Sequence, residues 1–352
     1  MQKLLKNEKF MNALVPICSA LLGLLAGAII MLISNYDPVK GYGALLDGII
    51  GRPKAIGETI RAMTPLILAG LAVAFAYKAG LFNIGVEGQL LVGWFASVWV
   101  GYALKLPTIV HVPLAILVAA IAGGIWGLVP GLLKARFKVH EVIVTIMMNY
   151  IALYITGDLI KRYLYAGNEK SYSIQKSASL SSQLLASLTE NSRLHFGIVV
   201  ALIAAIIMWF ILEKTTKGYE LRSVGINQHA SMYAGMNVSR NIVLSMTISG
   251  AFGGLAGAME GLGTFGNMNV LSSFTGTGFD GIAVALLGAN TSIGIILAAA
   301  LFGGLKTAAP EMNFVARVPS ELIDIIISLI IFFVASSYLI RWIFSRFSKE
   351  GE

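Results

Sequence analysis

Apolar stretches of about 20 residues recur along the whole chain, and they constrain its fold more than any other feature. Each stretch is long enough to cross a hydrocarbon core of about 30 Å as an α-helix. Only 12% of the residues are charged and the mean hydropathy is +0.78, whereas soluble proteins average about 25% charged residues. The sequence therefore predicts an all-α polytopic membrane protein that forms a single transmembrane domain over residues 1–352.

The hydropathy pattern predicts about ten transmembrane or half-membrane helices. The first follows Lys3, Lys6 and Lys9 and is longer than the apolar core of a signal peptide, so we expect a membrane anchor. Two inverted repeats are compatible with this pattern, although the two halves show no residue-level match. The expected ranges are 13–34, 62–79, 86–104, 110–133, 142–160, 196–213, 241–262, 278–289, 292–309 and 320–343.

The orientation follows from the short basic loop Lys134-Ala-Arg136-Phe-Lys138, because short loops rich in Lys and Arg stay in the cytoplasm. Counting outward from this loop places both termini and the loop 214–240 in the cytoplasm. It places outside the segment 35–61, which carries Arg52, Lys54 and Arg61, and the loop 161–195. The outer loop is rich in Ser and Gln. It either meets an extracellular partner or is a solvated connector.

Several classes of function are disfavoured by the composition. The net charge of +8 comes from basic residues at the ends of spans, which fits membrane topology better than nucleic-acid binding. Cys18 is the single cysteine and the four histidines are scattered, so we expect neither an intrachain disulfide nor a metal site. The segment 303–307 lacks the adjacent Gly-Lys of a phosphate-binding loop, and no catalytic group can be assembled. We therefore expect no enzyme activity and no cofactor in this chain.

Two polar interruptions break the apolar pattern at places where a transporter would carry its substrate route. The first, 78–89, carries Asn83 and Glu87, which at membrane depth should face an interior path rather than lipid. The alternative is a tight cytoplasmic turn with Lys78 and Glu87 both in water. The second, 261–290, is rich in Gly and Asn and leaves only a short apolar piece, which is typical of a discontinuous helix.

Asn149 lies in the middle of an expected span, next to Tyr150. Its amide either bonds between helices or lines the same path. Glycines at four-residue spacing occur in several spans and predict close approach of helix backbones. These glycines are Gly23/Gly27, Gly123/Gly127/Gly131, Gly250/Gly254 and Gly253/Gly257/Gly261.

The basic loop 214–240 encodes a short helix of its own. Asn227 is suited to cap the start of that helix, Gly235 to end it in a left-handed conformation, and Asn237 to cap the next span. Because a solvated linker seldom has capped helix ends, we favour a docking element, by which another protein moves this one, over a plain connector.

Three segments together resemble one family of membrane proteins. Residues 80–89, 140–152 and 218–230 resemble the permease subunits of bacterial ABC importers in the branched-chain amino acid, simple sugar and nucleoside group. Within it, the run Thr145-Ile-Met-Met-Asn149-Tyr150 is most similar to nucleoside (guanosine-type) uptake permeases of Gram-positive bacteria. The resemblance covers nearly the whole chain and implies a multi-pass protein of the bacterial cell membrane.

The resemblance also implies partners and site residues. It implies a second permease subunit, usually a different and related chain, two cytoplasmic ATPase domains that hold ATP and Mg, and an extracellular substrate-binding lipoprotein. Ser223 and Ser231 stand where the family often has Ala. The ATPase-coupling motif carries over onto Gly218, Leu221, Arg222, Gly225, Asn227, Ala230, Ala234 and Gly235. Candidates for the substrate path are Phe82, Asn83, Glu87, Gln89, Asn149, Tyr150 and Phe279, which offer amides and an acid for ribose and aromatic faces for a base.

The predicted function is therefore nucleoside uptake by alternating access, driven by separate ATPase subunits. A simple-sugar (ribose-like) ABC permease and an ion-coupled secondary transporter remain as alternatives, and the latter would need an intramembrane acid such as Glu87. A non-transporting scaffold would explain the capped loop but not the two polar breaks.

Overall fold

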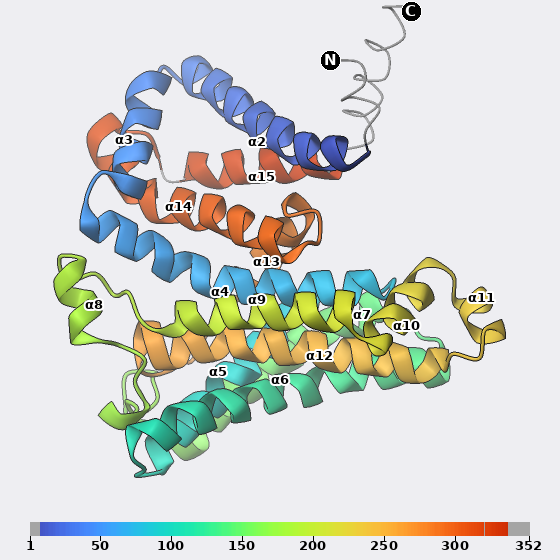
Figure 1. The fold of residues 1–352 in the computed structure, drawn as a ribbon. Coiled ribbons are helices and arrows are strands. Elements are labelled where there is room, and N and C mark those ends of the chain that lie inside the picture. The colour runs from blue at the N-terminus through green and yellow to red at the C-terminus, as the bar shows by residue number, and fades with distance from the viewer. Residues whose placement is uncertain (1–7, 320, 337–352) are drawn as a thin grey trace, which may run out of the picture.

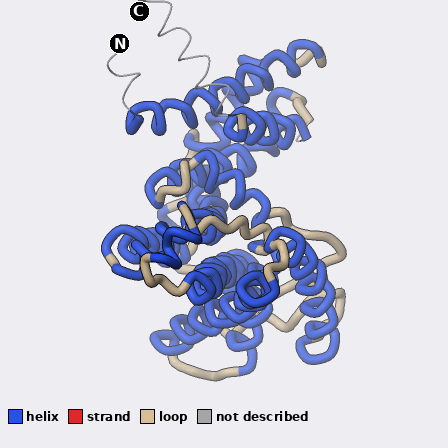
Figure 2. Tube along the Cα trace, turned by 90° about the vertical axis from the view of Figure 1, so that its right-hand side faces the viewer, coloured by secondary structure: helices blue, strands red, loops and turns tan. Residues whose placement is uncertain are grey.

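The computed structural model describes residues 8–319 and 321–336, which form a bundle of helices (Figure 1). Viewed from the end that carries α11, the helices gather in two groups joined through a narrower middle (Figure 2). The long helices are α2 (Glu8–Ile33), α3 (Pro38–Ile50), α4 (Pro53–Lys78), α5 (Val86–Ala103), α6 (Thr108–Phe137), α7 (Glu141–Leu159), α9 (Gly197–Lys214), α10 (Thr216–Ile226), α12 (Val238–Met259), α13 (Thr277–Leu287), α14 (Ser292–Ala316) and α15 (Glu321–Ala335). Shorter elements are α8 (Gln183–Leu188), α11 (Gln228–Tyr233), one 3-10 turn (Lys176–Ala178) and two π-helical extensions (Ile160–Leu164 and Glu260–Phe265).

The all-α membrane fold predicted from the sequence is confirmed. Within the described residues, seven helices are long and apolar enough to cross a membrane, and α13 is a shorter apolar helix. Every one of the ten expected ranges corresponds to a helix, although the last, 320–343, is described only over 321–336. The termini lie outside the described residues. The arrangement as two inverted repeats stays a prediction.

Several helical segments were not predicted, among them α3, the first part of α4, α8 and α10. α3 lies where no helix was expected, and it is too short to span a membrane. The side chain of Asp37 caps it, and its small buried face of Gly41, Ala44 and Gly48 packs toward α14. α4 begins at Pro53 rather than at residue 62, so charged residues that were assigned to an outer loop lie on a helix.

The predicted close packing through glycines is confirmed between α6 and α12. A Cβ atom on Gly123 would lie 2.3 Å from the carbonyl oxygen of Gly250, and one on Gly254 would lie 2.2 Å from that of Ala119. Only glycine allows the two backbones to come this close. The α6–α12 pair therefore forms the most extensive helix–helix contact among the described residues.

The loop 161–195 is ordered rather than a solvated connector. Its backbone bonds to the 262–270 segment, with Ser171 N–H donating to Met268 O at 2.8 Å and Leu180 N–H donating to Leu262 O at 2.9 Å. Gln175 N–H donates to Gly101 O at 2.8 Å and joins the loop to α5. This loop, which includes α8, lies at the opposite end of the bundle from α11 (Figure 1). We call these the α8 end and the α11 end.

Candidate functional site

The first polar interruption, predicted as residues 78–89, begins one residue later because Lys78 ends α4, and most of residues 79–89 lie deep in the bundle. We call it the α4–α5 break. Asn83 donates to the hydroxyl of Ser249 at 2.7 Å and to Oε1 of Gln89 at 3.0 Å. Ser249 is 11 residues into α12, about 16 Å along that helix, which is near the middle of a membrane. The polar break at membrane depth is therefore confirmed.

Glu87 fixes the start of the half-membrane helix α13. Its carboxylate accepts hydrogen bonds from the backbone N–H groups of Thr275 at 2.7 Å, Gly276 at 3.0 Å and Gly278 at 2.6 Å, and from the Thr275 hydroxyl at 2.7 Å. The free N–H groups at a helix start attract a negative charge, which explains this pairing. Glu87 has no exposed surface, so the alternative that placed it in water is wrong.

Asn149 joins α7 to the same break. Its Oδ1 accepts from Gly88 N–H at 2.8 Å and its Nδ2 donates to Ile84 O at 2.9 Å. The four polar candidates for the substrate path, Asn83, Glu87, Gln89 and Asn149, are thus brought together, and all are almost fully buried. Their hydrogen bonds hold helices to one another, and their role in a path stays a prediction.

The aromatic candidates lie beside this network. Tyr150 is about half exposed and packs edge-on against Phe274, with ring centroids 5.0 Å apart. Phe274 in turn packs on Phe279 at 5.6 Å. The structure therefore joins Tyr150 and Phe279 through Phe274, which the sequence analysis did not single out. Phe82 is partly buried within the break itself.

A hollow of about 700 Å³ lies on the α8 side of this network, between α4, α13 and α14. We call it the chamber. Its volume falls in the range of about 300–1,000 Å³ that is usual for small-molecule pockets. Its lining residues are Lys54, Glu58, Arg61, Ala62, Pro65, Leu66, Asn191, Arg193, Glu260, Thr277, Asp280, Lys306, Thr307 and Pro310.

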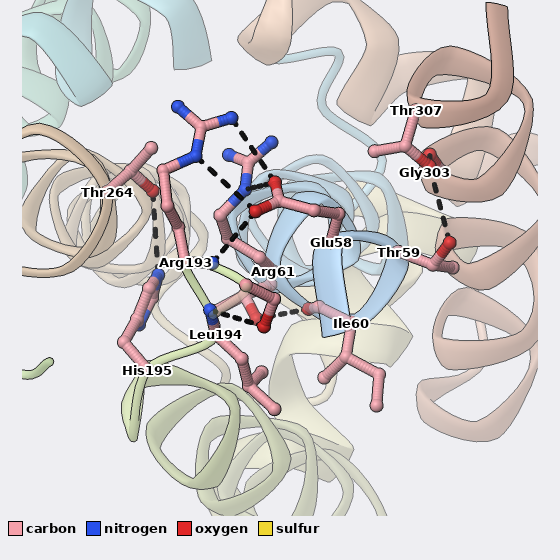
Figure 3. Close-up of polar contacts among 12 residues, drawn as sticks. Glu58, Thr59, Ile60, Arg61, Arg193, Leu194, His195, Thr264, Gly303 and Thr307 are labelled. Atoms are coloured by element: carbon pink, nitrogen blue, oxygen red, sulfur yellow. Dashed lines mark hydrogen bonds and ion pairs between the residues drawn. The ribbon is translucent and has the colours of Figure 1, made fainter. Parts of the chain in front are cut away.

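Charged groups meet at the mouth of the chamber (Figure 3). The Glu58 carboxylate lies between two guanidinium groups, 2.7 Å from Arg61 Nε and 3.2 Å from Arg193 Nη2. The backbone N–H of Arg193 also donates to Glu58 at 2.8 Å. Glu58 therefore ties the outer part of α4 to the end of the loop 161–195.

A second ion pair lies deeper in the chamber. Asp280, in the first turn of α13, pairs with Lys306 of α14. Lys306 is 14 residues into α14, about 21 Å along that helix, so the pair lies within the membrane. Thr277 and Asp280 form the floor of the chamber, directly next to the Glu87 contact.

His195 packs beside the chamber without lining it. Its Nδ1 accepts from Gly197 N–H at 3.1 Å, and its Nε2 lies 3.5 Å from the Thr264 hydroxyl (Figure 3). Burial, helped by the positive charge of Arg61, lowers the pKa of His195 to about 4. The imidazole is therefore neutral at physiological pH.

At the α11 end, the residues of the expected docking loop form two helices. Asn227 caps α11, Gly235 adopts a φ of +83° and Asn237 caps α12, as predicted. Leu221 is buried, while the side chains of Ile226, Met232 and Tyr233 are 87%, 57% and 89% exposed. Exposed apolar side chains on a water-facing loop are typical of an interface with another protein.

The docking loop touches the α4–α5 break through backbone contacts. A Cβ atom on Gly225 would lie 2.4 Å from the carbonyl oxygen of Lys78, and one on Gly80 would lie 2.9 Å from the Cα of Gly225. Gly218 meets the last turn of α9 equally closely, and Arg222 pairs with Glu213 at 2.8 Å. α10 is therefore held against α9 and the break, whereas Ala230 lies on α11 and Ala234 directly follows it, both exposed.

A comparison with known families places this chain. The family described as the permease component of the branched-chain amino acid transport system matches residues 55–335. The chain belongs to this permease family. No solved structure matches the permease significantly.

Three relatives of this permease are informative. It is 60% identical to the guanosine ABC transporter permease protein NupP of Bacillus subtilis (strain 168), over 98% of this chain and 99% of the relative. It is 40% identical to the nucleoside ABC transporter permease protein NupB of Lactococcus lactis subsp. cremoris (strain MG1363), over 95% and 94%. It is 30% identical to the guanosine ABC transporter permease protein NupQ of Bacillus subtilis (strain 168), over 70% and 79%.

Sequence reasoning missed the chamber of this permease. Lys306 lies inside an expected span and was considered only as part of a failed phosphate loop, although a charge within a span is itself a signal of function. Asp280 was noted only as part of the second interruption. Glu58 and Arg61 have helical i,i+3 spacing, but they lay in a segment that was assigned to an outer loop.

Proposed function

We propose that this chain is a permease subunit of an ATP-binding-cassette importer that takes up nucleosides. The 60% identity to a guanosine permease along almost the whole of both chains carries this proposal. The 40% identity to a nucleoside permease from a second genus supports the same substrate class. The weaker similarity to NupQ, a second guanosine permease of the same Bacillus strain, supports a partner permease that is a different, related chain.

The chamber is the proposed outer half of the substrate route. It reaches from the α8 end to the start of α13, and it is lined by carboxylates and cations. Carboxylate oxygens of Glu58 or Asp280 accept hydrogen bonds from ribose hydroxyls or base N–H groups, and a guanidinium such as that of Arg193 stacks on a purine. α13 closes the route below the chamber, with its start held by Glu87.

The docking helices α10 and α11 are the proposed contact with the ATPase subunits. Ile226, Met232 and Tyr233 offer the exposed apolar surface for this contact. Movement of α10 would displace the break through the contacts of Gly225 with Lys78 and Gly80. The break would in turn displace α13 through the hydrogen bonds of Glu87. One continuous set of contacts therefore links the docking surface to the floor of the chamber.

The proposed orientation has the α11 end in the cytoplasm and the α8 end outside, with both termini cytoplasmic. The predicted basic loop 134–138 is the last turn of α6 and its C-cap Lys138 in the structure, and its position at the α11 end supports this orientation. In this orientation the ordered loop 161–195 faces an extracellular substrate-binding lipoprotein. ATP and Mg are held by the partner subunits in this proposal.

A simple-sugar permease is the second candidate. The chain is 32% identical to the glucose ABC transporter permease protein TsgB13 of Haloferax volcanii, over 92% of this chain and 87% of the relative. The lower identity makes the sugar the weaker proposal.

Uptake of radiolabelled guanosine, with ribose as competitor, tests the proposal in cells that lack this chain and in cells where it is restored. We expect uptake to be lost on deletion, restored by the unchanged chain and insensitive to ribose. Arg222→Glu and Gly225→Trp should insert into the membrane without restoring uptake. A protonophore that abolishes uptake at normal ATP levels would instead indicate ion coupling, and unchanged uptake on deletion would refute the nucleoside assignment.

A further inference from the structure

A groove separate from the chamber lies between α6 and α12 at the α11 end. We call it the basic groove, and its volume is about 830 Å³. Its apolar lining includes Leu128, Leu132, Val243 and Leu244, and its charged lining includes Arg136 and Arg240. None of these residues lines the chamber or belongs to the aromatic group of Tyr150, Phe274 and Phe279.

The inner part of the groove is apolar and lies within the membrane. Leu128 and Leu132 of α6 face Val243 and Leu244 of α12 across it. From Arg240 at the rim to Thr247 the groove follows seven residues of α12, about 10 Å, which is about two thirds of the hydrocarbon depth of one leaflet. A water-soluble partner does not reach this depth, whereas an acyl chain does.

The outer part of the groove is cationic. Lys217 pairs with Glu220 at 2.7 Å, and this hydrogen bond, together with one from Asn241, lowers the pKa of Glu220, which stays charged. Lys217 is therefore already neutralised. Arg136 and Arg240 are exposed, and neither lies within ion-pair distance of an acidic side chain among the described side chains of residues 14–319 and 321–334. The charge of Arg240 adds to the lowering of the Glu220 pKa without a direct ion pair.

The start of α12 adds to the positive potential at this rim. Ser239 and Arg240 lie in its first turn, where backbone N–H groups carry partial positive charge. Two unpaired guanidinium groups and a helix start thus surround the entrance of an apolar slot. A guanidinium binds phosphate oxygens through paired N–H groups.

We propose that the basic groove binds an anionic phospholipid, with its phosphate between Arg136 and Arg240 and an acyl chain along the surface groove that α6 and α12 line. Basic pockets between membrane helices on the cytoplasmic side are suited to anionic headgroups. The apolar depth selects a lipid over free phosphate. Because the phosphate contacts one arginine on each helix, the bound lipid joins the ends of the α6–α12 pair beside the docking helices.

The test uses the assembled transporter, purified in detergent and stripped of lipid. Dioleoyl phosphatidylglycerol or dioleoyl phosphatidylcholine is added, and bound lipid is counted by native mass spectrometry while the melting temperature is followed. We expect phosphatidylglycerol to be retained and to raise the melting temperature, and phosphatidylcholine to do neither. Glycerol phosphate, which has the headgroup charge without acyl chains, should not compete.

Paired substitutions locate the site. Arg136→Glu with Arg240→Glu should weaken phosphatidylglycerol binding by about tenfold or more, because each cation near the surface contributes to lipid attraction. Lys138→Glu with Lys105→Glu changes the net charge equally outside the groove and should bind as the unchanged protein does. Arg136→Gln with Arg240→Gln, a milder pair, should also weaken binding if the charge-reversed pair fails to assemble.

Three results would overturn the proposal. Equal retention of phosphatidylcholine would show that charge plays no part. Full competition by glycerol phosphate would indicate a soluble-anion site. Undiminished phosphatidylglycerol binding in both arginine pairs would place the lipid elsewhere, and would leave the basic rim as a surface for an acidic partner protein.

Discussion

The α4–α5 break and the chamber are both polar regions inside a membrane-spanning bundle, yet they are built in opposite ways. Asn83 and Glu87 of the break, and Asn149 of α7 that bonds to it, are almost fully buried, and their polar atoms are bonded to neighbouring segments. In the chamber, ion pairs surround about 700 Å³ of space. Polarity at membrane depth therefore serves two purposes here. It locks helices together in one region and provides room for a polar substrate in the other.

The largest expected effect is on the break. Glu87→Ala leaves the N–H groups of Thr275, Gly276 and Gly278 without their acceptor, and we expect a loss of about 3–5 kcal/mol in folding free energy, because a buried unpaired donor costs about 1–3 kcal/mol. This loss of stability is measured by the yield and the melting temperature of the purified transporter. Glu190→Ala, on the exposed loop, should have no effect. A Glu87→Ala protein as stable as the unchanged one would show that Glu87 does not hold the start of α13.

The second effect is a pH dependence next to the chamber. The pKa of His195 is about 4 in the folded protein against 6.5 for the free side chain, so the unfolded chain takes up a proton that the folded protein excludes. The contribution of His195 to the free energy of unfolding should be constant above pH 6.5 and fall as the pH drops toward 4, by about 3 kcal/mol in total. Melting curves between pH 4 and 7 test this. His195→Asn should flatten the slope of melting temperature against pH, whereas His229→Asn on exposed α11 should leave that slope unchanged. Equal slopes in the two variants would contradict this prediction.

The third effect separates transport from folding. Asp280→Asn or Lys306→Met removes a charge from the chamber, and we expect guanosine uptake per assembled complex to fall about tenfold, equivalent to about 1.4 kcal/mol. The exchanged pair, Asp280→Lys with Lys306→Asp, should recover part of the uptake. Asp158→Asn breaks an exposed ion pair with Arg162 and serves as the matched control. Normal uptake in both chamber variants would remove this ion pair from the route.

The smallest effect concerns the amide of Asn149 on α7, which bonds to the break. Asn149→Ala loses the bonds to Gly88 and Ile84, and we expect about 1 kcal/mol of destabilisation. The contacts predict uptake per assembled complex close to that of the unchanged protein. A marked further loss of uptake would favour the sequence-based prediction that Asn149 lines the path.

Local features of the fold were predictable because they depend on neighbouring residues. The caps at Asn227 and Asn237 and the left-handed Gly235 follow from residue type and spacing. The break at 79–89 was predictable since polar residues interrupt an apolar run. α3 was missed because a helix of 13 residues with few strongly apolar positions gives no membrane signal.

The pairing of distant residues was not predictable. Glu87 and Gly278 are 191 positions apart, and nothing in either segment specifies the other. The same holds for Glu58 and Arg193, which are 135 positions apart. Individual charges in spans, such as Lys306, were visible, but a single sequence does not say whether such a charge faces a hollow or a partner. The chamber therefore emerged only from the three-dimensional arrangement.

The most direct measurement compares thiol accessibility in the two regions. With Cys18→Ala as background, Thr277→Cys places a thiol on the chamber floor, and Ser249→Cys places one on α12 where Asn83 of the break bonds to it. A membrane-impermeant charged thiol reagent is added from outside to the assembled transporter, with or without guanosine and its binding protein. The account predicts that Thr277→Cys is modified and that guanosine slows its modification, while Ser249→Cys does not react. Modification of Ser249→Cys that guanosine slows, with Thr277→Cys unreactive, would contradict it and place the route through the break.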